Sequence, residues 1–227
     1  MKLVAPDFDR RIDLPGAGPC PRPVDVDRAK TGFDTLVSLR VYSFAKGAAI
    51  DGEAEGDEVF IVLMRGQADL AVESQGERVG PFALRGTGAR AVYLPPDAAY
   101  HLTAAADCDI AYARSKPDAS QPRAVRDFTA ADERLDVAGY ASGMDLTLAK
   151  LMIGDTEPLI ASDGRSPERF VHVGSDSTGV AAVGDATLAN WDSAVIDDGE
   201  HATLTVRGGA VDVLVITAST HRSEPRD

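Results

Sequence analysis

Short runs of apolar residues, many of them alternating with polar ones, dominate this chain from Leu36 onward. Residues 58–64 are almost continuously apolar, whereas residues 67–73 alternate Ala, Leu and Val with polar partners. Short runs bounded by Gly, Pro and Asp are typical of strands in a β-sandwich or barrel. The predicted strands are residues 36–44, 58–64, 67–73, 91–94, 101–104, 109–113, 146–153, 169–173, 179–183, 193–196, 202–206 and 211–218. No stretch keeps a helical period long enough to predict a long helix, so the pattern predicts an all-β fold.

Segments of the first half have counterparts in the second half. The matched pairs are residues 58–62 with 168–172, 91–94 with 194–197, and 108–113 with 211–216. An internal repeat indicates duplicated domains, with chance similarity between β-rich segments as the alternative. Residues 1–31 are rich in Pro, Gly and Asp and predict an extended arm outside the core, lying along a barrel or a neighbouring subunit. The expected units are an arm (1–31), a first barrel (32–116), a linker and connecting segment (117–144), a second barrel (145–220) and a tail (221–227).

Composition narrows the choice of partners. The 227 residues carry a formal net charge of -13 with no acidic tail, which disfavours binding to nucleic acid or to anionic membranes. The longest apolar run, Val59 to Met64, is too short to span a bilayer, and the amino terminus has no features of a signal peptide. We therefore expect a cytoplasmic location. Two cysteines, Cys20 and Cys108, are no disulfide framework, so reduced structural thiols are favoured over a bridge.

Two segments resemble the conserved motifs of the cupin superfamily. In residues 47–68 a strand carries Glu58 and ends in a Gly turn at Gly66, as in the first cupin motif. In residues 92–101 a Pro turn precedes His101, as in the second. The order of arm, cupin, Pro-containing linker and second cupin most resembles the 5-deoxy-glucuronate isomerase family of inositol catabolism. The resemblance implies two tandem cupin barrels, that is, double-stranded β-helix or jelly-roll domains.

That resemblance also implies a metal site in the second barrel, made of two His one residue apart, a Glu on the next strand and a His after a later Gly turn. Glu168 matches the Glu, and His201 in Asp-Gly-Glu-His matches the last His. Residues 159–167, which should supply the paired His, contain none, although Asp163 could be a third ligand. A divalent transition metal needs three or four converging ligands, so no cofactor is the first expectation and such a metal the alternative. Glu168 and His201 are the candidate catalytic residues; a hydrogen-bonded polar pair in a metal-free pocket is the other interpretation.

Other side chains are candidates for ligand binding. In the first half they are Glu58, Tyr100 and His101, although a surface or hydrogen-bonded His101 is the alternative. His172 alternates with Phe170 and should share its face, where a structural hydrogen bond is the competing role. Arg85, Arg90 and Arg114 could bind a sugar carboxylate bidentately or be surface charges.

Three functions follow from these observations. The first expectation is a cupin that binds a small molecule, a sugar or sugar acid, without the paired His ligands. The second is a metal-dependent aldose–ketose isomerase that acts on a uronic acid derivative, with Glu168 moving a proton. The third is a structural or assembly protein. A homodimer through the N-terminal arm or the barrel edges is left open.

Overall fold

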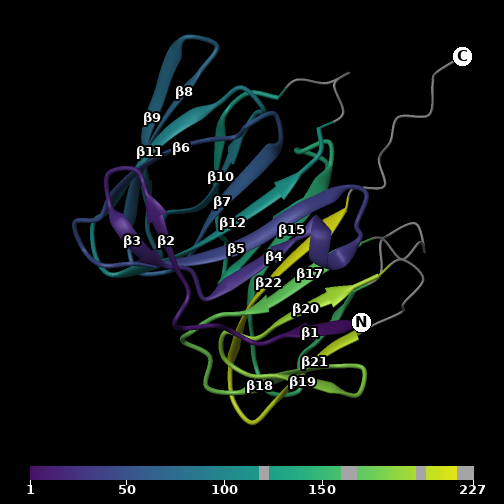
Figure 1. Ribbon diagram of the computed structural model, residues 1–227. Helices are drawn as coiled ribbons and strands as arrows, with labels where there is room; N and C mark the ends of the chain where they lie inside the picture. Colours follow the sequence, from purple (N-terminus) through teal and green to yellow (C-terminus); the bar gives the residue numbers. More distant parts are fainter. Residues whose placement is uncertain (118–122, 160–167, 198–202, 219–227) are drawn as a thin grey trace, which may run out of the picture.

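A computed structural model describes residues 1–117, 123–159, 168–197 and 203–218 of the chain. It contains two antiparallel β-barrels that pack side by side, so the all-β fold with two tandem barrels is confirmed (Figure 1). The one described helix, α1 (Arg28–Thr31), is four residues long. No helix among the described residues is long and apolar enough to cross a membrane.

The first barrel is a curled ten-stranded sheet. Its strands follow the order β4-β5-β12-β7-β10-β9-β8-β11-β6, with β13 beside β10. Their bounds are β4 (Val24–Asp27), β5 (Leu36–Phe44), β6 (Ala49–Glu53), β7 (Glu58–Arg65), β8 (Ala68–Ser74), β9 (Glu77–Leu84), β10 (Ala89–Leu94), β11 (Ala99–Ala104), β12 (Cys108–Ser115) and β13 (Arg126–Thr129).

The second barrel consists of a six-stranded and a four-stranded sheet. The larger sheet contains, in spatial order, β1 (Lys2–Val4), β20 (Ser193–Ile196), β17 (Arg169–Val173), β22 (Val211–Ala218), β15 (Met144–Leu151) and β14 (Arg134–Val137). The smaller sheet contains β16 (Thr156–Pro158), β21 (Thr203–Arg207), β18 (Val180–Val183) and β19 (Ala186–Leu188). A separate hairpin of β2 (Arg11–Leu14) and β3 (Gly18–Pro21) precedes the first barrel.

Strand β7 lies between the two barrels and contributes side chains to two cores. It is buried along almost its whole length because both of its faces are covered. Val59, Ile61 and Leu63 point into the interior of the first barrel. Phe60 and Val62 point the other way, into a core shared with Phe170, Leu214 and other residues of the second barrel. The continuous apolar run therefore marks a strand between two cores.

The two halves have equivalent strand pairings. Strand β12 lies between β5 and β7, and β22 lies between β15 and β17 in the same way. The predicted match of residues 91–94 with 194–197 is one residue out of register. Leu94 and Ile196 both face barrel interiors, whereas Tyr93 and Val195 both face the shared core. Because side chains alternate along a strand, Leu94 corresponds to Ile196 and not to Asp197.

The N-terminal segment is extended and lies along the barrels, but its strand β4 belongs to the core, contrary to the prediction for residues 1–31. Strand β1 pairs with β20 of the second barrel, and β4 pairs with β5 of the first. Val24 and Val26 of β4 are fully buried in the shared core. The prediction failed because Pro and Asp dominate the composition of the segment, while alternate Val side chains decide where β4 lies. A homodimer through this segment stays a prediction.

Candidate functional site

The interior of the first barrel contains a cavity of about 190 Å³ that opens beside the β2–β3 hairpin. Its apolar part includes Phe44, Ile61 and Leu102. Alternation along β5 places Arg40 and Tyr42 on the same inward face as Phe44, because these residues are two apart. The cavity is therefore lined by apolar side chains together with three tyrosines, three arginines and the acidic residues Asp51, Glu53 and Glu55.

Arg114 is the most buried cation of this cavity. It belongs to β12 and is 8% exposed. Its Nη1 donates to a carboxylate oxygen of Glu55 at 2.8 Å, and its Nη2 lies 2.8 Å from Asp57 and donates to the carbonyl of Ala54 at 2.9 Å. Its Nε is buried and has no hydrogen-bond partner among the described residues. A buried guanidinium needs these anionic partners, because an unpaired charge is costly to bury.

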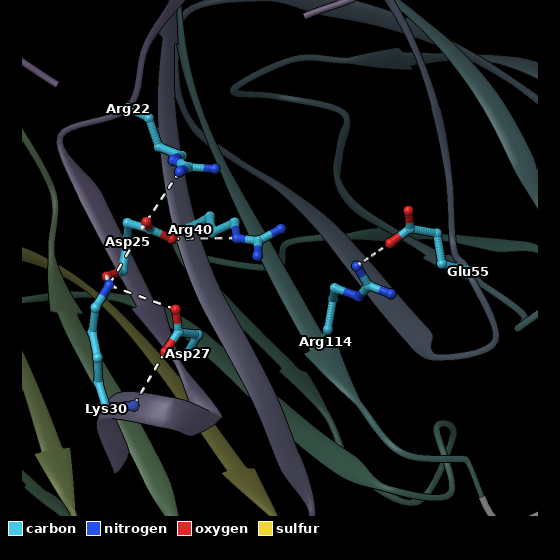
Figure 2. A network of polar contacts seen from close by, with 7 residues as sticks. All are labelled: Arg22, Asp25, Asp27, Lys30, Arg40, Glu55 and Arg114. Carbon is cyan, nitrogen blue, oxygen red and sulfur yellow. Dashed lines mark hydrogen bonds and ion pairs between the residues drawn. The ribbon is translucent and has the colours of Figure 1, made fainter. Parts of the chain in front are cut away.

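Two further arginines share one carboxylate at the same cavity. Arg22 and Arg40 lie 3.0 Å and 3.3 Å from the carboxylate oxygens of Asp25, which Lys30 also approaches at 3.7 Å. Figure 2 shows the Arg40 side chain reaching from Asp25 towards the Arg114–Glu55 pair. Arg22, Arg40 and Arg114 all line the cavity.

Tyr42, Tyr100 and Tyr112 form the aromatic wall. The rings of Tyr100 and Tyr112 lie 5.9 Å apart, and the Tyr112 hydroxyl donates to the carbonyl of Glu53 at 3.2 Å. Burial raises the pKa of Tyr112 to about 12 and raises that of Tyr100 further. Both phenols are therefore neutral hydrogen-bonding groups at physiological pH. The predicted ligand-binding residue Tyr100 lies in this wall.

Glu58, also predicted to bind ligand, bridges the two halves. Its carboxylate accepts hydrogen bonds from the Tyr93 hydroxyl at 2.7 Å and from the backbone N–H groups of Ser142 and Gly143 at 2.9 Å and 2.8 Å. The side chain is 1% exposed. Ser142 and Gly143 immediately precede β15, the first strand of the second barrel's repeat unit. Glu58 therefore fixes the start of the second repeat.

Glu168 occupies the equivalent position in the second half and makes the reciprocal contact. Its carboxylate accepts the backbone N–H groups of Asp34, Thr35 and Leu36, the last two at 2.9 Å and 2.8 Å. These residues precede and begin β5, the strand that corresponds to β15. Each Glu thus holds the first strand of the other repeat. The hypothesis that Glu168 forms a site with His201 stays a prediction, because His201 and Asp163 lie outside the described residues.

The two remaining predicted His residues, His101 and His172, do not line the cavity. His172 shares the face of Phe170 as expected, but that face is the core between the barrels. Its Nδ1 lies 3.0 Å from the Ser193 hydroxyl, and burial lowers its pKa to about 4. His101 is half exposed on the outer face of β11, with its Nδ1 2.8 Å from Asp51.

The described interior of the second barrel is mainly apolar, although the fully buried Arg169 lies on the same face of β17 as Val171 and Val173. It is lined by Val171, Val173, Val213, Val215 and other aliphatic side chains. Within the ranges that the structure describes, no three His, Cys, Asp or Glu side chains gather where they could hold a metal ion. Apolar walls cannot replace the hydration shell of a cation. The described residues of this barrel therefore do not fit the metal centre that the family resemblance implies.

The sequence did not predict that Arg22, Arg40, Tyr42 and Glu55 line the cavity. For Arg40 and Tyr42 a signal was present, since both alternate with buried residues in the predicted strand 36–44. Of the three arginines suggested for carboxylate binding, Arg114 lines the cavity. Arg85 instead pairs with Asp69 at 2.6 Å, and Arg90 donates to the carbonyls of Leu63 and Met64.

Comparison with known proteins agrees with this architecture. The model of the KduI/IolB family matches residues 21–142, which cover the first barrel from β4 onward and almost all of the connecting segment. No curated protein matches the chain. Solved structures with a similar fold have low sequence identity, so they bear on the fold alone.

Three of these structures illustrate the likeness. An IolB-like protein from Salmonella typhimurium is 16% identical with a TM-score of 0.71, over 97% of this chain and 93% of that one. The protein Ylba from E. coli is 16% identical with a TM-score of 0.66, over 98% and 92%. A cupin 2 conserved barrel domain protein from Leptotrichia buccalis is 12% identical with a TM-score of 0.52, over 96% of each chain. The barrels are thus of the cupin type.

Proposed function

The chain belongs to the KduI/IolB family, and from this premise we propose that it binds a sugar or sugar acid in the interior of its first cupin barrel. The observation that carries the proposal is the cavity of about 190 Å³, which three arginines and three tyrosines line together with apolar side chains. Tyrosine and arginine are suited to sugar acids, because they offer flat apolar surfaces together with hydrogen-bond donors. The volume is below the 300–1,000 Å³ that is usual for drug-sized ligands, which favours a small molecule.

The choice of the first barrel rests on its contrast with the second. Specific pockets combine apolar walls with a few convergent polar groups, and the first barrel has both. The described interior of the second barrel is mainly aliphatic and shows, besides the fully buried Arg169, no comparable gathering of polar side chains among the described residues. We also propose that the paired metal-binding His residues of the family are missing from this chain. Their loss would leave a barrel that binds its ligand without metal chemistry.

Calorimetric titration with D-glucuronate, a uronic acid, tests the proposal. We expect saturable binding of one ligand per chain. Gly52→Ala should abolish it, because a Cβ at Gly52 would lie 2.4 Å from the Tyr100 ring and would push that ring out of place. Gly86→Ala is the matched control, since nothing lies within 4 Å of a Cβ at that position.

Two results would contradict the proposal. Absence of binding would remove the small-molecule function and leave an assembly role. Conversion of the sugar, followed by NMR and accompanied by about one metal ion per chain, would replace it with the isomerase.

A further inference from the structure

We infer that Arg40 and Arg114 form a carboxylate-binding subsite in the first barrel, and that Glu55 occupies this subsite until the acid group of a ligand displaces it. The inference rests on the proposed function, because it specifies the ligand class and the way in which the same cavity is opened. It is carried by the ion pairs of Arg114, by the exposure of Glu55, and by the groups that would remain when Glu55 moves.

Glu55 is one of two carboxylates that pair with the buried Arg114, and Asp57 is the other. Moving Glu55 away leaves the Nη1 of Arg114 without its anionic partner. A ligand carboxylate would take that place, whereas a neutral sugar brings no charge to pair with the guanidinium.

Glu55 is the carboxylate best able to leave. Its side chain is 66% exposed, compared with 13% for Asp25, 34% for Asp27 and 19% for Asp57. When it swings outward its charge is solvated by water, so the exchange costs little desolvation. The other three carboxylates would be harder to replace, because they are more enclosed by the protein.

The turn between β6 and β7 places Glu55 beside the cavity. Glu55 and Gly56 are the central residues of the turn between β6 and β7, with φ of 53° and 84°. The turn is closed by the Asp57 N–H, which donates to the carbonyl of Ala54 at 3.1 Å. Asn or Gly is the usual first residue of a turn with two positive φ angles. A non-glycine residue held in this conformation is common at functional sites.

The arginines stay in position when Glu55 leaves. Arg114 keeps Asp57 and the carbonyl of Ala54, both on its Nη2, while its Nη1 is released. Arg40 uses its Nε for Asp25, and its two terminal nitrogens have no partner in the described part of the chain. In Figure 2 the Arg40 guanidinium points towards the Arg114–Glu55 pair. A ligand carboxylate that displaces Glu55 would accept from the released Nη1 of Arg114, and the terminal nitrogens of Arg40, which lines the same cavity, are available as further donors.

The experiment compares D-glucuronate with its neutral amide, D-glucuronamide, by calorimetric titration. Glu55→Gln should bind D-glucuronate about two- to fivefold more tightly than the unmodified protein, the range expected for loss of a competing, largely exposed ion pair. Its affinity for D-glucuronamide should be unchanged. Glu73→Gln is the matched control: it removes the same charge from an exposed position of the same barrel that does not line the cavity.

Replacement of the arginines gives the opposite result. Arg114→Gln should weaken D-glucuronate binding at least tenfold, without a matching loss for the amide. Because Arg114 is buried and its loss can destabilise the barrel, Arg40→Gln is the second variant, since Arg40 has a single carboxylate partner.

The outcomes separate this inference from the proposed function. If D-glucuronate and D-glucuronamide bind equally, or if Glu55→Gln binds the acid no more tightly, the carboxylate subsite is overturned while binding in the barrel stands. If neither compound binds to the unmodified protein or to Glu55→Gln, both the proposed function and this inference fail.

Discussion

Glu58→Gln tests the contact by which the first barrel holds the second. The carboxylate of Glu58 is fully enclosed and accepts three hydrogen bonds, from Tyr93, Ser142 and Gly143. Gln has nearly the same shape, but its amide nitrogen is a donor. That nitrogen would face a hydroxyl or a backbone N–H group, and so one buried donor would lose its acceptor.

The size of the effect follows from these contacts. A hydrogen bond to a charged acceptor contributes about 1.5–3 kcal/mol, and a buried donor left without a partner costs about 1–3 kcal/mol. We expect Glu58→Gln to lower the free energy of unfolding by about 3 kcal/mol. In a chain of 150–250 residues this corresponds to a fall in Tm of roughly 6–12 °C.

Urea denaturation and calorimetry measure this loss. Glu77→Gln is the matched control, because Glu77 is exposed on β9 and the same change there should stay within about 0.5 kcal/mol. If Glu58→Gln were as stable as Glu77→Gln, the reciprocal carboxylate contacts would not hold the barrels together, and our explanation of the repeat interface would be wrong.

Two further predictions concern buried titratable groups. Stability should fall as the pH drops from about 6.5 towards 4, by roughly 3 kcal/mol, because the unfolded chain protonates its His in this range while burial keeps the pKa of His172 at about 4. Urea titrations across this range should show a shallower pH dependence in His172→Gln; an unchanged slope would contradict the assignment. Cys20 and Cys108 are free and buried, and burial raises the pKa of both thiols, that of Cys108 to about 12. A thiol reagent at pH 8 should therefore label neither in the folded protein and both after unfolding without reductant; fewer than two labels would indicate a disulfide.

Much of the fold could be predicted because alternation depends on local sequence alone. Residues 36–44, 169–173, 193–196 and 211–218 are strands with the predicted bounds. The short strands of the N-terminal segment and β6, β9, β13, β14, β16 and β19 were missed. All of these except β9 are three to five residues long, which is too short to establish an alternating pattern, and their pairing with neighbouring strands keeps them extended.

The roles of Glu58 and Glu168 could not be predicted, although their equivalence was visible in the repeat. Each accepts N–H groups that are more than 80 positions away in the sequence, and backbone donors cannot be recognised from the amino-acid composition. The position of the cavity could not be predicted for a similar reason. It depends on Asp25 of the Pro-rich N-terminal segment, which pairs with Arg40 across β4 and β5.

The central claim is that the ligand lies in the first barrel. Nuclear Overhauser effects between D-glucuronate and ¹³C-labelled tyrosine rings test it directly. Three of the chain's five tyrosines, Tyr42, Tyr100 and Tyr112, line the cavity, whereas Tyr93 and Tyr140 lie in or against the core between the barrels. The account predicts contacts from the sugar to the first three rings. Contacts to none of them, with binding detected elsewhere in the protein, would contradict it.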